Sequence, residues 1–245
     1  MNKQVYYWCT VIVIAVVVVI GFLTVSDNGN TSNNQSIYNE TEQNVGTENK
    51  DENTNITVEE NNLTNYLEDQ TTIMDKMLTE MKNIPHVGNP AIDFLYGMTL
   101  HHESAIAMAE SYLKYGGNHA ELKQMAEDMI KTQDAEIEQM QSMIQKLEEE
   151  GMKDETKEAE YLKAYQKILE ENKASHSMGA PDTIDEAFAE GMTLHHEMAV
   201  QMAETVLQYT ENEEVRHMAQ NIIEMQNKEI TKMRELINQM ANQMA

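Results

Sequence analysis

The chain has 245 residues and a formal net charge of −25, because 42 acidic side chains outnumber 17 basic ones. This excess disfavours nucleic acid as a partner, since binding to a phosphate backbone requires clustered cations. A single cysteine, Cys9, excludes an intramolecular disulfide and a zinc site made of cysteines. By contrast, 20 methionines, 19 of them after residue 70, indicate a core rich in thioethers.

The N-terminal segment 1–25 contains an uncharged, mostly apolar run from Val5 to Val25. A helix of about 20 such residues spans a bilayer. We therefore expect a transmembrane anchor, or alternatively a signal peptide that is removed. Lys3 is the nearby cation, which places the N-terminus in the cytosol and the rest of the chain outside. The expected location is the cell membrane, with a single pass and an extracytoplasmic C-terminal domain, or secretion if the segment is cleaved.

Residues 26–70 are rich in Asn, Thr, Glu and Ser and contain few large apolar side chains. Such a segment buries too little apolar surface to offset the entropy lost on ordering. The composition therefore predicts a disordered polar tether between the anchor and a folded domain.

The remainder of the chain repeats itself. Residues 97–115 align with residues 191–209, and thirteen of the 19 positions are identical, including the run GMTLHHE. The two copies predict a first helical repeat over 71–150 and a second over 151–245. A role shared by both copies is expected to leave matched residues in each.

Each repeat is predicted to contain a lead-in helix followed by a helical hairpin. The first hairpin covers 91–115 and 119–150 with a turn at Gly116–Asn118, and the second covers 183–209 and 213–243. Two such hairpins pair into a four-helix bundle, so the predicted fold is all-α. The sequence leaves open whether the repeats pack within one chain or between chains of a homo-oligomer.

Histidine and glutamate side chains on otherwise apolar helix faces are the first indication of a binding site. Met98, His101 and His102 share one face of the first hairpin, and Glu136 lies in a methionine stripe of the facing helix. The second copy repeats this arrangement with Glu229 among Met218, Met225 and Met233. A buried carboxylate must be paired, so the facing histidines are its expected partners.

Imidazole and thioether ligands together suit copper, and thioethers favour Cu(I) or its analogue Ag(I). Outside the cell, methionine also cannot form disulfides. We therefore expect a copper site in each copy. The expected ligands are Met98, His101, His102, Met108 and Met140 in the first copy and Met192, His195, His196, Met202 and Met233 in the second. Glu136 and Glu229 are expected to orient imidazoles, and His86 and His176 could act as outer ligands.

The spacing Met-x2-His-His, with Ala and Met-Ala after it and Gln-x2-Glu-Ile-x2-Met in the next helix, occurs in both copies. In this pattern the chain resembles the family known as domain of unknown function 305, over residues 90–147 and 183–240. The resemblance implies a ferritin-like helical fold and a function like that of the CopM-like copper-binding proteins, with Cu(I) or Ag(I) as the bound ion. It does not account for the anchor, the tether or the lead-in helices.

Two other functions are compatible with a helical bundle. In the first, the protein is a structural or partner-binding bundle at the cell surface, with methionine as core filler and no metal. In the second, it is a di-iron enzyme, which needs two Glu-x-x-His motifs. Glu214 and His217 have that spacing, but the matched position in the first copy is Gln124. We therefore expect a membrane-anchored copper buffer or resistance protein rather than an enzyme.

Overall fold

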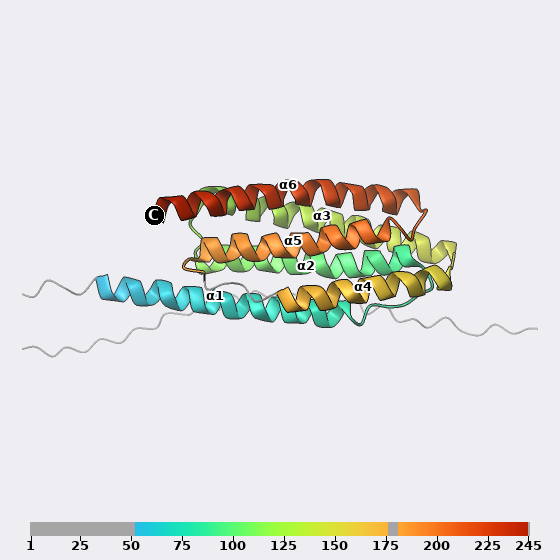
Figure 1. Cartoon of the computed structure of the whole chain (residues 1–245), viewed down its shortest axis with the longest axis horizontal. Coiled ribbons are helices and arrows are strands. Elements are labelled where there is room, and N and C mark those ends of the chain that lie inside the picture. Colours follow the sequence, from blue (N-terminus) through green and yellow to red (C-terminus); the bar gives the residue numbers. More distant parts are fainter. Residues whose placement is uncertain (1–51, 176–180, 245) are drawn as a thin grey trace, which may run out of the picture. The chain divides into compact units, whose positions relative to one another are not determined.

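The computed structural model describes residues 52–175 and 181–244, and every regular element in these ranges is a helix (Figure 1). The helices are α1 (Glu52–Met81), α2 (Pro90–Tyr115), α3 (Ala120–Glu150), α4 (Glu155–Ser175), α5 (Ile184–Val206) and α6 (Glu213–Met244). The all-helical prediction is therefore confirmed for the described part of the chain. The predicted anchor at Val5–Val25 lies outside the described residues, as does His176.

Local sequence signals set the helix ends. The side chain of Asn89 caps α2 by accepting a hydrogen bond from the Ala91 amide, and Pro90 occupies the first turn, where its missing N–H costs nothing. Gly116 ends α2 in a left-handed conformation with φ of 96°. In the second repeat, the Thr183 hydroxyl caps α5 by accepting from the Glu186 amide. The predicted turn at Gly116–Asn118 thus lies between α2 and α3.

The six described helices form three layers (Figure 1). Helices α2 and α5 pack against each other in the middle layer, α3 and α6 lie on one side of them, and α1 and α4 lie on the other. Small residues (Ala105 and Ala109 on α2, Ala199 and Ala203 on α5) are fully buried in these central helices. The two hairpins therefore build two layers, and the lead-in helices add a third to the four-helix arrangement that the sequence predicted.

Helix α1 begins at Glu52, so the prediction that the tether extends to residue 70 is wrong. Tyr66 and Gln70 are buried, one helical turn apart, and Met74 continues the same face. The composition was misleading because this helix is polar on its exposed sides and contributes only a narrow stripe to the core. The part of the tether before residue 52 lies outside the described residues.

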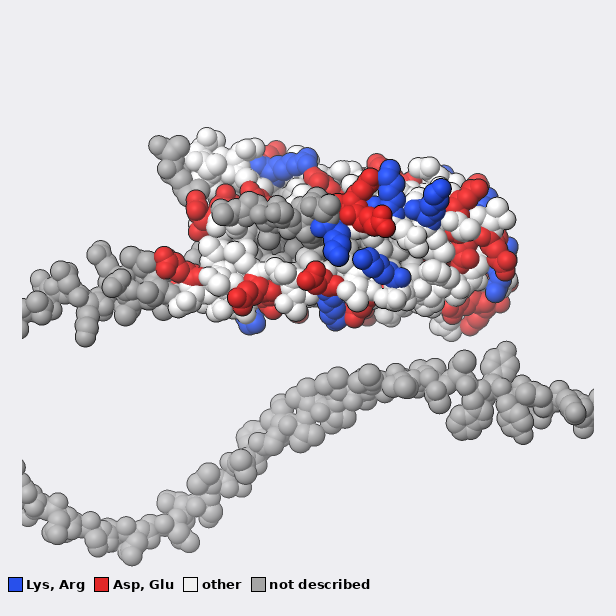
Figure 2. All heavy atoms as spheres, turned by 60° about the horizontal axis from the view of Figure 1, so that its bottom comes forward, with Lys and Arg blue, Asp and Glu red and all other residues white. Residues whose placement is uncertain are grey.

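Within the described ranges, no helix has the length and apolar character needed to cross a bilayer. Acidic and basic side chains are interspersed on the face shown in Figure 2, without a continuous basic patch. Two ion pairs join the outer helices α3 and α6, between Glu121 and Lys232 and between Lys146 and Glu214. These pairs involve exposed side chains, so each contributes little to stability.

Candidate metal sites

The first histidine of each pair lies at the interface between the two repeats. The rings of His101 on α2 and His195 on α5 have centroids 3.7 Å apart and an interplanar angle of 39°. Both side chains are fully buried. The Nε2 atom of His101 is 3.0 Å from the His195 carbonyl oxygen, and because a carbonyl only accepts, His101 donates. These two histidines therefore join the repeats.

A serine connects this interface to helix α1. The Ser104 hydroxyl is 2.7 Å from His195 Nε2, 2.7 Å from the His101 carbonyl oxygen and 2.8 Å from the Met77 sulfur. The matched position in the second copy is Met198, which is also fully buried. Sequence reasoning missed Ser104, because its copy carries a different residue and no repeat signal marked it.

The second histidine of each pair faces the partner helix of its own hairpin. His102 Nε2 lies 2.9 Å from Glu136 Oε2, and His196 Nε2 lies 2.8 Å from Glu229 Oε2. Both histidine side chains have no exposed surface, whereas the glutamates are 20% and 25% exposed. The predicted contact between carboxylate and imidazole is thus present in both copies, although the glutamates are less buried than expected.

Adjacent histidines point to different neighbours. The ring centroids of His101 and His102 are 6.3 Å apart, and those of His195 and His196 are 6.2 Å apart. Within each pair the two Nε2 atoms contact different partners. They are the His195 carbonyl oxygen and Glu136 for His101 and His102, and Ser104 and Glu229 for His195 and His196. The structure therefore does not bring both histidines of one copy to a single point, as the sequence-based grouping assumed.

The predicted methionine ligands are all buried, with at most 2% of each exposed. They are Met98, Met108 and Met140 in the first repeat and Met192, Met202 and Met233 in the second. The Met140 sulfur lies 3.9 Å from the Thr99 hydroxyl of α2. Met108 lies more than a turn beyond His102 and lines a separate cavity with Met74 of α1. Met225, which the sequence placed in the buried stripe, is 43% exposed.

The remaining candidate ligands lie away from the histidine pairs. His86 is exposed in the connection between α1 and α2. Glu214 forms an ion pair with Lys146, and His217 contacts Asn221 at the surface, so the Glu-x-x-His spacing does not point into the core. In the described residues, no group of three or more His, Cys, Asp or Glu side chains could hold a metal ion.

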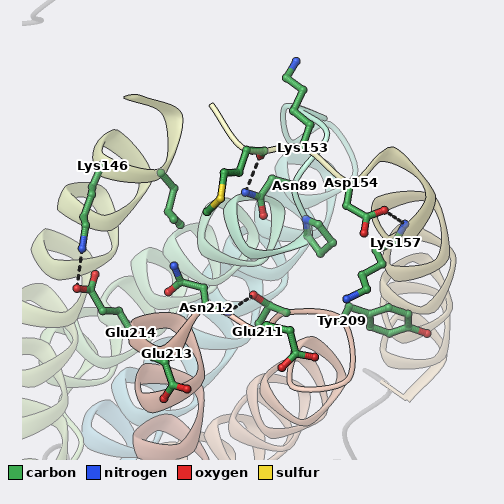
Figure 3. A pocket seen from close by; sticks show the side chains of 14 residues that line it. Asn89, Lys146, Lys153, Asp154, Lys157, Tyr209, Glu211, Asn212, Glu213 and Glu214 are labelled. Atoms are coloured by element: carbon green, nitrogen blue, oxygen red, sulfur yellow. Dashed lines mark hydrogen bonds and ion pairs between the residues drawn. The ribbon is translucent and has the colours of Figure 1, made fainter. Parts of the chain in front are cut away.

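An open hollow of about 530 Å³ lies elsewhere, at the end of the bundle where the helix connections meet (Figure 3). Its polar walls bond to each other: Lys146 pairs with Glu214, and Asn89 donates to the Met152 carbonyl oxygen. None of the histidines discussed above lines it. The hollow is therefore separate from the histidine pairs.

No curated protein matches the chain. Among solved structures, "CopM in the Ag-bound form (by soaking)" and "CopM in the Cu(I)-bound form" are similar to it, each with 28% sequence identity and a TM-score of 0.46. These similarities cover 61% of this chain and 95% and 96% of the other chains. The model of the family described as Domain of unknown function (DUF305) matches residues 32–144 and 91–237, together well over half of the chain. The chain therefore belongs to the DUF305 family.

Proposed function

We propose that this protein binds Cu(I), with Ag(I) as an analogue, at one site in each repeat. The first site consists of His102, Met98 and Met140, and the second consists of His196, Met192 and Met233. Glu136 and Glu229 orient the imidazoles. His101 and His195, which the sequence grouped with the ligands, join the repeats instead.

The hydrogen bonding of the second histidine in each repeat is the main support for this proposal. The carboxylate of Glu136 accepts a hydrogen bond from His102 Nε2, which leaves the lone pair on Nδ1. That Nδ1 atom is buried and has no hydrogen-bond partner, and the same holds for Nδ1 of His196 beside Glu229. A carboxylate that fixes the imidazole tautomer from the far side is the usual support of a histidine ligand.

We take two thioethers as the further ligands of each site. Met98 precedes His102 by four residues, so their side chains are neighbours on α2. Met140 follows Glu136 by four residues on α3 and contacts Thr99, the residue after Met98, so we take it as the second thioether of this site. Met192 and Met233 have the corresponding positions in the second repeat. In this proposal each repeat contributes one imidazole nitrogen and two thioether sulfurs.

The donor set favours a soft monovalent ion. Imidazole and thioether are neutral ligands, and one carboxylate beside each site balances a single positive charge. A divalent ion would keep an uncompensated charge in a largely buried position, which is costly. Thioether sulfur also prefers Cu(I) to harder ions. Copper is the cargo in this proposal, and the protein acts as a buffer or resistance factor rather than an enzyme.

The expected anchor at Val5–Val25 would hold this domain outside the cell membrane. In an oxidising compartment, a site built from methionine and histidine keeps its ligands, whereas paired thiols would form disulfides. Export and anchoring are parts of the proposal, and they can be tested by fractionating cells and probing which side of the membrane residues 52–244 occupy.

The binding test is an anaerobic Cu(I) titration of the full chain against a competing chromophoric chelator. We expect tight uptake that is lost when His102 and His196 are both changed to Ala. The matched control changes His119 and His217, which lie outside both sites. Unaltered uptake by the H102A/H196A variant would refute the ligand assignment. No uptake by the natural chain would favour a structural or partner-binding bundle.

A further inference from the structure

A cavity of about 150 Å³ lies where α1 crosses the central helices α2 and α5. It shares no residue with the two sites proposed above. Two thioether side chains line it, Met74 from α1 and Met108 from α2. They are 8% and 2% exposed, so both sulfurs are shielded from bulk water.

An amide without partners lines the same cavity. Gln70 is 2% exposed, and neither its Oε1 nor its Nε2 atom has a hydrogen-bond partner. Burying a polar group without a partner is unfavourable, and native proteins rarely do so without a compensating ligand or water. The Gln70 oxygen is therefore available to a guest in the cavity.

The two lead-in helices pack alike but carry different chemistry. From Gln70 onward, the buried positions of α1 are Gln70, Met74, Met77, Leu78 and Met81, and those of α4 at the same spacing are Tyr161, Tyr165, Ile168, Leu169 and Asn172. Core packing is thus satisfied by either set. What distinguishes α1 is that it brings thioethers to the interface. The second repeat has Met202 in place of Met108 but Tyr165 in place of Met74, so it can offer one thioether at most.

We propose that this cavity is a further soft-cation site, in which the Met74 and Met108 sulfurs and the Gln70 oxygen hold Cu(I) or Ag(I). The choice of ion rests on the proposed function, although the ligands do not. Asp75 and Lys173 also line the cavity, and their opposite charges offset each other. Thioether chemistry, rather than net charge, therefore selects the ion.

The test uses the full chain in detergent with carbon-13 in the methionine methyl groups, titrated with silver nitrate. Methyl resonances are assigned from single Met→Leu variants, which conserve side-chain volume. We expect the Met74 and Met108 methyl signals to move on addition of Ag(I), and to do so equally in the H102A/H196A variant. The M74L/M108L variant should bind one Ag(I) fewer than the natural chain. The control M129L changes a buried methionine of α3 outside all three sites and should leave the stoichiometry unchanged.

The outcomes separate the two proposals. If the Met98 and Met140 methyl signals move while those of Met74 and Met108 stay fixed, the cavity does not bind the ion and this inference is wrong, although the proposed function stands. If only Met74 and Met108 respond, the cavity site is supported and the histidine sites are refuted. If M129L lowers the stoichiometry as much as M74L/M108L does, the loss reflects general repacking and overturns the inference.

Discussion

His101 and His195 lie against each other across the α2–α5 interface, with 3.7 Å between their ring centroids and a tilt of 39° between the rings, and His101 Nε2 donates to the His195 carbonyl oxygen. This contact uses the first histidine of each repeat to hold the two repeats together. The second histidine, His102 or His196, is then directed to the glutamate of its own hairpin. In each His-His motif, the first histidine thus contributes to packing between the repeats and the second to the proposed copper site.

Replacing His101 with Ala should therefore lower stability without removing a metal site. We expect a loss of about 2–4 kcal/mol in the free energy of unfolding, as for other large-to-small changes in a core. The number of Cu(I) ions bound should be unchanged in protein that remains folded. Urea unfolding and a chelator competition on the same sample check both points. Exposed His217, changed to Ala, is the control. Loss of a bound ion in folded H101A would show that His101 is a ligand.

Glu136 should affect both stability and affinity. Its removal in E136A leaves His102 Nε2 buried without an acceptor, which costs about 1–3 kcal/mol. It also frees the imidazole to change tautomer, so Cu(I) affinity at the first site should fall about 10–100-fold. E136Q keeps an acceptor oxygen and should lose less stability and less Cu(I) affinity than E136A. E229A should reproduce the effect in the second repeat, measured by urea unfolding and competition titration. Equal behaviour of E136A and the natural chain would contradict the orienting role.

Asp93 should make the protein less stable as the pH rises. Burial and, to a lesser extent, the nearby Glu158 carboxylate of α4 together raise the pKa of this α2 carboxyl to about 8. Between the ordinary carboxyl pKa of 3.8 and about 8, the folded state holds a proton that the unfolded state has lost. The contribution of Asp93 to the free energy of unfolding is therefore fully present below pH 3.8 and is lost as the pH rises toward about 8. The slope is at most about 1.4 kcal/mol per pH unit.

The D93N variant should flatten this dependence and be more stable than the natural chain near pH 8, because it keeps the neutral form. The buried hydroxyls of Tyr161 and Tyr165 face the same interface and stay neutral throughout this range, since burial raises the pKa of both phenols. Urea midpoints at several pH values between 4 and 9 measure the slope. The exposed carboxyl of Glu138, changed to Gln, is the control. If the pH dependence of stability persists in D93N, another titrating group causes it.

Gly97 should tolerate no side chain while Tyr165 is present. A Cβ atom at Gly97 would lie 2.7 Å from the Tyr165 hydroxyl oxygen, which itself donates to the Met81 carbonyl oxygen. We expect G97A to cost about 1–3 kcal/mol through overpacking between α2 and α4. Y165F removes the closest atom, so adding G97A to Y165F should cost less than adding it to the natural chain. A double-mutant cycle from urea unfolding measures this coupling, and additive effects would mean that the two residues do not meet.

Much of the fold could be predicted from local patterns. Asn89, Pro90 and Gly116 mark the ends of α2 through capping and backbone preference, which depend on neighbours in sequence. The internal repeat indicated two equivalent hairpins, and the position of Glu136 in an apolar stripe indicated a histidine partner. The start of α1 could not be predicted in this way, because the narrow stripe of Tyr66, Gln70 and Met74 is stabilised by packing against other helices.

By itself, the sequence determined the helices, their repeat and the residue types that face the core, because helical periodicity fixes which side chains share a face. Only the tertiary structure decided which face meets which neighbour. The crossing of α2 and α5 directs His101 to His195 and leaves His102 to Glu136, and the docking of α1 brings Met74 to Met108. These pairings depend on the rotation and contact of helices distant in the chain, which a one-dimensional pattern does not encode.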